Sequence, residues 1–317
     1  MPSPTNIRFW KKKAVLFGME AAYGVDPVLA GTDWFEARNV SLTPFDVESL
    51  DRNIAQPWMG NSGKLIVAMR QKLSFDVALA GSGSLGVAPK IGKLLRAIGF
   101  AETVTVATKV EYTLIDSAFE SAAFYINVDG VLHKGMGLRG TGQAVLDAKG
   151  IPVLRVELTA LYTAKVDAAP AVGDRTGWPM EEAVNSANTQ VCKVNAVDSF
   201  YSKFGFSLGN QVSHDIYGGG YQQIKIGDRQ PKANITMLAP LLATFNPYTL
   251  AGAGDTAATN IAVQVVHGAT AGSKVQVDMK AIITGVNEAD MNGEVGYDLT
   301  LEPTPVTGND EIKLTFI

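Results

Sequence analysis

The sequence predicts a mostly β fold, with one clear helix, that the chain repeats in two tandem copies. One observation is a strand–turn–strand pattern over residues 134–163 that recurs without a gap over 277–303. Another is the likeness of residues 72–79 to 232–238, in the same order along the chain. In all four segments apolar and polar side chains alternate, which gives a strand one core face and one outward face. Matches in one order indicate duplication of a domain of ordinary size.

Composition narrows the classes of function. The formal net charge is −4, which disfavours a strongly basic surface for binding nucleic acid. Charged residues make up 18% of the chain, below the roughly 25% of soluble domains, as in proteins that bury surface against copies of themselves. Cys192 is the only cysteine, so no internal disulfide forms and folding in a cytosol is expected. No segment has the length of a secretion signal or a membrane span, and no membrane partner is expected.

Residues 1–36 are predicted to form an N-terminal arm. Their aromatic side chains, Phe9 and Trp10 among them, stand between glycines and prolines without a clear period. Aromatic groups on an irregular arm need a surface to cover them. That surface is either a partner or the arm's own domain, and the sequence leaves both open.

A strand is expected at 37–43, followed by a polar loop at 44–63 and a strand at 64–80. The loop is longer than a hairpin requires and carries Trp58 and Met59 at its far end. Long insertions between strands tend to be functional. We expect an adhesive contact at this tip, with a tryptophan folded back on the sheet as the alternative.

The clearest helix follows a glycine-rich break at residues 81–86. Pro89 suits its first turn, Gly99 suits its end, and an apolar stripe lies between them. The stripe consists of Ile91, Leu94, Leu95 and Ile98. Strands are expected at 103–115 and 122–128, with a turn at Asp129–Gly130 that leads into the repeated hairpin.

The second copy is predicted to begin after a linker rich in Ala, Pro, Gly and Asn at 164–190. Its loop at 209–222 is shorter than its counterpart, and its helix at 239–252 is weaker because of two prolines. An alternating strand at 312–316 ends the chain. The expected domains are therefore residues 37–163 and 191–317.

No motif predicts catalysis, a cofactor or a metal. The segment Gly81–Gly86 fits GxGxxG, but the strand before it alternates, no βαβ series follows, and the second copy lacks the glycines. The histidines, His133, His214 and His267, are scattered, and Cys192 has no neighbouring ligand. No GxSxG nucleophile elbow is present. We expect a protein that is not an enzyme.

Four segments together resemble one family. They are residues 12–24, 81–100, 206–212 and 226–232, which sample almost the full length. The chain resembles a tail tube (major tail) protein of long-tailed bacteriophages and prophages. One departure is Gln211, where an acidic residue is usual.

The resemblance implies two β-sandwich or half-barrel domains, each with a flanking helix that is weak in the second. It implies a structural virion protein, assembled in the bacterial cytoplasm, that forms stacked rings and a hollow tube for DNA. Expected partners are other copies of the chain and the tail terminator, tape measure and baseplate or tip proteins. Two domains in one chain favour three chains in a pseudo-sixfold ring, although the sequence leaves three or six chains, the tail type and the host open.

The hypothesis assigns the tube wall to strands 69–80, 151–163, 229–238 and 294–303, with their polar faces toward the lumen or an adjoining surface. The lumen-facing candidates are Ser74, Asp76, Arg155, Glu157, Asn234, Thr236, Asp298, Thr300 and Glu302. The candidates for contacts between stacked rings are Phe9, Trp10, Trp58 and Met59.

Other functions stay open from the sequence. A terminator ring or a secretion inner-tube protein of the same fold family would form single rings. A carbohydrate-binding β protein would need an aromatic platform on a sheet face, and Trp34, Trp58 and Trp178 lie outside the expected strands.

Overall fold

The computed structural model describes residues 7–254 and 257–317 and confirms the mostly β prediction. The elements of the first half are β1 (Lys13–Met19), η1 (Gly31–Asp33), β2 (Arg38–Asp51), β3 (Lys64–Ala78), α1 (Gly92–Ala97), β4 (Phe100–Thr105), β5 (Lys109–Leu114), β6 (Ala122–Val128), β7 (Val131–Val145), β8 (Val153–Leu161) and β9 (Val166–Asp167).

The second half also contains a long hairpin near its end, β17–β18. Its elements are β10 (Val191–Val194), β11 (Val197–Asp198), β12 (Tyr201–Ser207), β13 (Asn210–Tyr217), β14 (Tyr221–Arg229), β15 (Lys232–Leu238), α2 (Pro247–Leu250), β16 (Ile261–His267), β17 (Val275–Met291), β18 (Glu294–Pro303) and β19 (Ile312–Phe316).

Both halves contain the same antiparallel sequence of four strands. In the first half β2 pairs with β3, β3 with β8, and β8 with β7. In the second half β12 pairs with β15, β15 with β18, and β18 with β17. The register is also repeated, since Ser74 lies opposite Glu157 and Asn234 lies opposite Thr300. The two segment matches found in the sequence therefore correspond in space. The exact division into domains at 163 and 191 stays a prediction.

The two four-stranded parts join edge to edge into one continuous sheet. β12 of the second half pairs antiparallel with the end of β7, so that Gly205 lies opposite Val145 and Ser207 opposite Gln143. A second junction pairs β19 with β5. The order β2-β3-β8-β7-β12-β15-β18-β17 thus runs through both halves.

A second layer covers one face of this sheet. β1 pairs with β6, and β6 with the first part of β7, while β10 and β16 extend from the first part of β17. The core between the layers is contiguous over both halves and includes Phe17, Phe75 and Phe204. The predicted stripe of α1, from Ile91 to Ile98, is fully buried there.

Several boundaries differ from the sequence prediction. Residues 13–19 of the expected N-terminal arm form β1, which pairs with β6 inside the body. The expected loop at 44–63 is strand as far as Asp51. The expected strand at 103–115 is the hairpin β4–β5. The expected loop at 209–222 lies mostly in the hairpin β13–β14. At 45–51 and 210–217 cross-strand pairing extends strand structure beyond the stretch where the apolar alternation is visible, whereas at 103–115 a turn divides the expected strand into two.

Candidate assembly surfaces

All nine lumen-facing candidates lie on one face of the continuous sheet. In an antiparallel pair, residues directly opposite each other point to the same side. Ser74 lies opposite Glu157 and Asp76 opposite Arg155 on β3 and β8. On β15 and β18, Asn234 and Thr236 lie opposite Thr300 and Asp298, with Glu302 further along β18. The polar positions of both halves therefore form one surface.

This polar face carries both signs of charge and is internally hydrogen bonded. The Arg155 guanidinium lies 3.9 Å from the Asp76 carboxylate, which also accepts a bond of 2.8 Å from the Asn39 side chain. Thr236 Oγ1 donates to Asp298 Oδ1 over 3.0 Å. The opposite face is apolar, because Leu73, Phe75 and their cross-strand neighbours are buried in the core.

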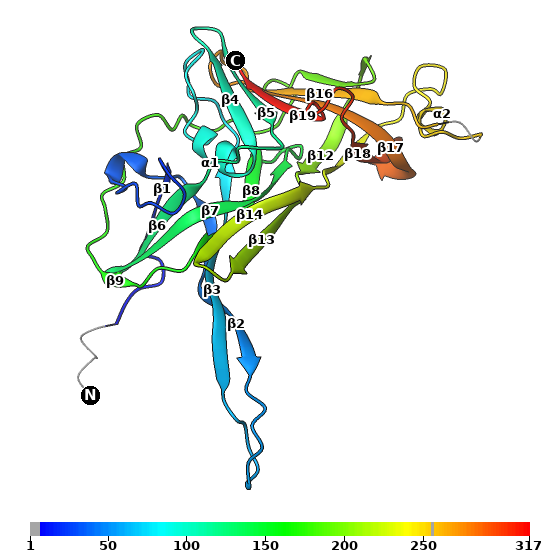
Figure 1. Cartoon of the computed structure of the whole chain (residues 1–317). Coiled ribbons are helices and arrows are strands. Elements are labelled where there is room, and N and C mark those ends of the chain that lie inside the picture. The colour runs from blue at the N-terminus through cyan, green and yellow to red at the C-terminus, as the bar shows by residue number, and fades with distance from the viewer. Residues whose placement is uncertain (1–6, 255–256) are drawn as a thin grey trace, which may run out of the picture.

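A long hairpin extends away from the sheet that carries this polar face. It consists of the far ends of β2 and β3 with their connecting loop, residues 45–69, and we call it the projecting hairpin (Figure 1). Trp58 is 69% exposed and Met59 is 100% exposed at its tip. Further exposed apolar side chains lie along its strands and connecting loop, namely Phe45, Leu50, Ile54, Leu65, Ile66, Val67 and Met69. Exposed apolar side chains gathered on a thin hairpin are typical of a protein–protein contact.

Ion pairs hold the base of the projecting hairpin. Arg70 donates to Asp46 Oδ2 at 2.7 Å and to Glu48 Oε1 at 2.6 Å, and Lys72 lies 2.9 Å from Asp46. The hydrogen bonds from Lys72 and Arg70 keep the pKa of Asp46 below its usual range. Side chains of β2 and β3 are therefore tied together at the root of the hairpin.

Phe9 and Trp10 are exposed, and they lie away from the projecting hairpin, just before β1. The Phe9 amide donates to Asp129 Oδ2 over 2.6 Å, and the Lys13 ammonium lies 3.4 Å from the centre of the Trp10 ring. These residues are thus anchored beside the turn between β6 and β7, whereas Trp58 and Met59 are at the far tip of the projecting hairpin (Figure 1). The four candidates do not form a single patch.

The hairpin β13–β14, which we call the covered hairpin, lies against the first half instead. Gly209 bends the chain between β12 and β13 with a φ of +61°, and a Cβ there would clash with the Gln230 carbonyl. Ile224 and Ile226 of β14 have buried side chains. Asn210 donates through Nδ2 to the carbonyls of Ile98 and Gly140, at 2.7 and 2.9 Å.

Arg139 on β7 ties the covered hairpin to the first half. Its guanidinium donates to three carbonyls, those of Glu120 at 3.1 Å, Phe119 at 2.6 Å and Ile224 at 2.8 Å. Tyr23 adds a bond by accepting from the Ile224 amide at 2.5 Å. Burial lowers the pKa of Arg139. Sequence reasoning missed this residue, and the only local signal is a single cation within a glycine-rich strand.

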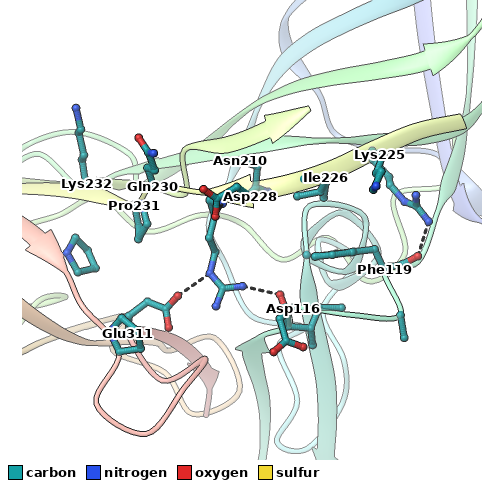
Figure 2. Close-up of a pocket in the computed structure, with 18 of the residues that line it drawn as sticks. Asp116, Phe119, Asn210, Lys225, Ile226, Asp228, Gln230, Pro231, Lys232 and Glu311 are labelled. Carbon is teal, nitrogen blue, oxygen red and sulfur yellow. Dashed lines mark hydrogen bonds and ion pairs between the residues drawn. The ribbon is translucent and has the colours of Figure 1, made fainter. Parts of the chain in front are cut away.

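A groove of about 1080 Å³ follows the seam between the two halves (Figure 2). Arg229 spans it, donating to Glu311 Oε1 at 2.6 Å and to the Ile115 carbonyl at 2.5 Å. Figure 2 shows Glu311 across the groove from the strand that carries Lys225 and Asp228. The charged groups of the groove thus connect β14 to segments of both halves.

The motifs considered for chemistry have structural roles. Backbone amides of the GxGxxG segment are used within the chain, because Gly81 and Gly83 donate to the carbonyls of Ser273 and Gly272. Within residues 7–254 and 257–317, no three His, Cys, Asp or Glu side chains are grouped to hold a metal ion. No helix in those two ranges has the length and apolar character needed to cross a membrane.

The comparisons with known proteins agree with the resemblance found in the sequence. No curated protein matches the chain significantly. A family model described as phage tail tube protein matches residues 10–316. That family is one of structural phage tail proteins, not of enzymes, and its members are parts of the virion tail. Because the match covers nearly the whole chain, the protein belongs to the phage tail tube protein family.

Proposed function

We propose that copies of this chain assemble into rings, that the rings stack into the hollow tail tube, and that DNA passes through the tube to the host. The observation that carries the proposal is the polar face that runs without interruption through both halves. It ends on two outer strands, β2 and β17, which are completed by neighbouring copies. An unpaired strand edge is otherwise a site of aggregation.

The polar face forms the lumen in this proposal. Its side chains mix Arg155 with Asp76 and Glu157, and the neutral Asn234 and Thr300 separate the charges of the second half. The exposed Lys72, Lys203 and Lys232 share this face with the carboxylates. Because phosphate binding depends on clustered Lys and Arg, a wall on which cations and carboxylates are mixed does not hold DNA in place. DNA therefore slides through without sequence preference.

Three chains form one ring, because each chain supplies two related sets of four strands and so makes a pseudo-sixfold ring. Closed cyclic symmetry is the usual outcome when one contact is repeated head to tail. Assembly takes place in the cytoplasm of the host bacterium, and the finished tube joins the terminator, tape measure and baseplate or tip proteins.

The projecting hairpin and the segment around Phe9 and Trp10 make the contacts between stacked rings. The projecting hairpin supports this role because its tip is exposed and apolar and extends well beyond the sheet (Figure 1). Two separate contact points, one at the hairpin tip and one before β1, fix the rotation of one ring on the next.

Negative-stain electron microscopy of the concentrated protein tests the proposal. Long cylinders of uniform diameter are the expected result. Single rings that never stack would instead support a terminator or an inner-tube component of the same fold family. A monomer at millimolar concentration would contradict both assignments.

A further inference from the structure

We propose that the free edge of β2 in one copy pairs antiparallel with the free edge of β17 in the next copy, in the register that β12 and β7 adopt inside the chain. This joint rests on the proposed function, because it is the contact that closes the ring. It names the strands, the residues opposite one another and the partner, which is a second copy.

The template is the junction between the two halves. In this junction residues 205–207 pair with residues 143–145. One hydrogen bond extends the pairing at each end: the Leu208 amide donates to the Gly142 carbonyl at 2.9 Å, and the Leu146 amide donates to the Phe204 carbonyl at 2.8 Å. The chain therefore already contains one complete example of the proposed joint, in which β12 of the second half is added to the edge of β7 of the first half.

β2 occupies in the first half the place that β12 occupies in the second. Both are the outer neighbours of matched strands, since Ser41 lies opposite Ser74 on β3 and Gly205 lies opposite Asn234 on β15. Ser74 and Asn234 are equivalent because both lie opposite equivalent residues of the next strand. Ser41 is therefore the counterpart of Gly205, and Thr43 is the counterpart of Ser207.

β17 likewise corresponds to β7. Val145 lies opposite Val153, and Ala289 lies opposite Gly296, at matching positions of the two hairpins. The register shift between Ile283 and Gly285 adds one residue to β17. After this shift, each residue of β7 corresponds to the β17 residue one position later than the ungapped sequence match indicates. Asn287 is therefore the counterpart of Gln143.

These equivalences place Ser41 opposite Ala289, Leu42 opposite Glu288 and Thr43 opposite Asn287. Within the described part of the chain, residues 282–291 pair only with β18, and β2 pairs only with β3. Pro44, the counterpart of Leu208, has no amide hydrogen to donate, and its carbonyl accepts from Lys165 Nζ at 2.6 Å. The ladder thus ends after Thr43, with the same three residue pairs as inside the chain.

The charges beside the two edges are complementary. Glu288, Asp290 and Glu294 lie at the free end of the β17–β18 hairpin, and none has an ion-pair partner among the described residues. Next to β2, Arg8 and Lys165 line one hollow together with Pro44. An acidic edge on one end of the chain and a basic edge on the other favour head-to-tail contact and disfavour contact between like ends.

Paired cysteines test the register. Thr43 and Asn287 are exposed, lie on the polar face opposite Lys72 and Asp298, and come within disulfide distance when their strands pair. The variant with both Thr43→Cys and Asn287→Cys is expected to form covalent dimers and closed oligomers on mild oxidation of the assembled protein. Ser41→Cys with Ala289→Cys is a second pair of the same kind. The native Cys192 does not interfere, because burial raises the pKa of its thiol to about 12.

The matched control is Thr43→Cys with Glu288→Cys. This pair is one residue out of register, which places the two thiols on opposite faces of the sheet, and no crosslink is expected. Tubes that form by electron microscopy while both in-register pairs stay monomeric under denaturing, non-reducing conditions would overturn the joint and leave the proposed function standing. Parent protein that forms neither rings nor tubes would overturn the proposed function, and the joint with it.

Discussion

The two long hairpins of the chain differ in what covers them. The covered hairpin buries Ile224 and Ile226 against the first half and is held by Arg139 and Asn210. The projecting hairpin has a similar supply of apolar side chains, yet its Met59 is fully exposed and Leu50, Leu65 and Ile66 on its strands are more than half exposed. The hairpin at this position is therefore packed against the rest of the chain in the second half and exposed in the first half.

The bend at Gly209 accounts for much of this difference. It turns β13 away from the line of β12 and down onto β7. β2 has no such break between the ladder residues and the tip, and its register shifts leave the strand continuous from Arg38 to Asp51. The projecting hairpin therefore extends away from the rest of the molecule, and its apolar side chains stay exposed (Figure 1).

The largest expected effect follows from removing the apolar tip of the projecting hairpin. Replacing Trp58 and Met59 together by Ser should stop tube growth, because this change removes the exposed apolar tip and both side chains are mostly exposed within the molecule. The thermal unfolding midpoint should stay that of the parent. Tube length by electron microscopy and calorimetry are the two measurements.

The matched control for that variant is the tip of the covered hairpin. Tyr217 and Tyr221 are 63% and 45% exposed and stack with ring centres 5.3 Å apart. Replacing both by Ser is expected to leave tube length unchanged. Tubes of normal length from the Trp58 and Met59 variant would remove the projecting hairpin from any role between rings.

A smaller effect is expected when one strand residue of each hairpin is replaced by Ala and the loss of stability is compared. Ile224→Ala should lower the free energy of unfolding by about 2–4 kcal/mol, because it empties a fully buried site. Leu65→Ala should change it by less than about 0.5 kcal/mol, because Leu65 is 57% exposed. Urea unfolding of the dilute protein measures both. Equal losses from the two variants would mean that the projecting hairpin is covered within the monomer.

The smallest effect concerns pH at the place where the two hairpins come near each other. Burial first, and then the charge of Arg70 at the root of the projecting hairpin, lower the pKa of His214 on β13. A group with a lowered pKa in the folded state binds fewer protons there, so stability falls as the pH drops below the unfolded value of about 6.5.

The His214→Gln variant tests this sign. It should lose less stability than the parent between pH 7 and pH 5, as measured by urea unfolding at each pH. The remaining slope has other sources, because burial also lowers the pKa of His133 and His267. A parent-like slope in the variant would show that His214 does not contribute.

Local pattern was enough to predict the strands and helix that build the sheet and its core. Alternation over residues 72–79 and 154–159 identified β3 and β8 with their correct faces, because each such strand has one buried side. The four residues of the α1 stripe are all buried, although the helix itself has only six residues.

Long-range contacts explain what the sequence did not reveal. Nothing near Arg139 indicates that carbonyls from residues 119, 120 and 224 converge on it. Residues 45–51 lack a clear alternation because neither face of that part of β2 meets a core, so only its partner β3 shows that it is a strand. The sequence left open what covers Phe9 and Trp10, and their distance from Trp58 depends on where β1 is placed by β6.

The junction of β12 with β7 also bears on how fast a ring can close. Both strands belong to one polypeptide, so that joint forms by a first-order step whose rate is independent of protein concentration. In a three-chain ring, half of the six joints are then made during folding, and only three wait for diffusion to bring chains together. Dilute protein in an infected cell would reach closed rings sooner than six separate units could.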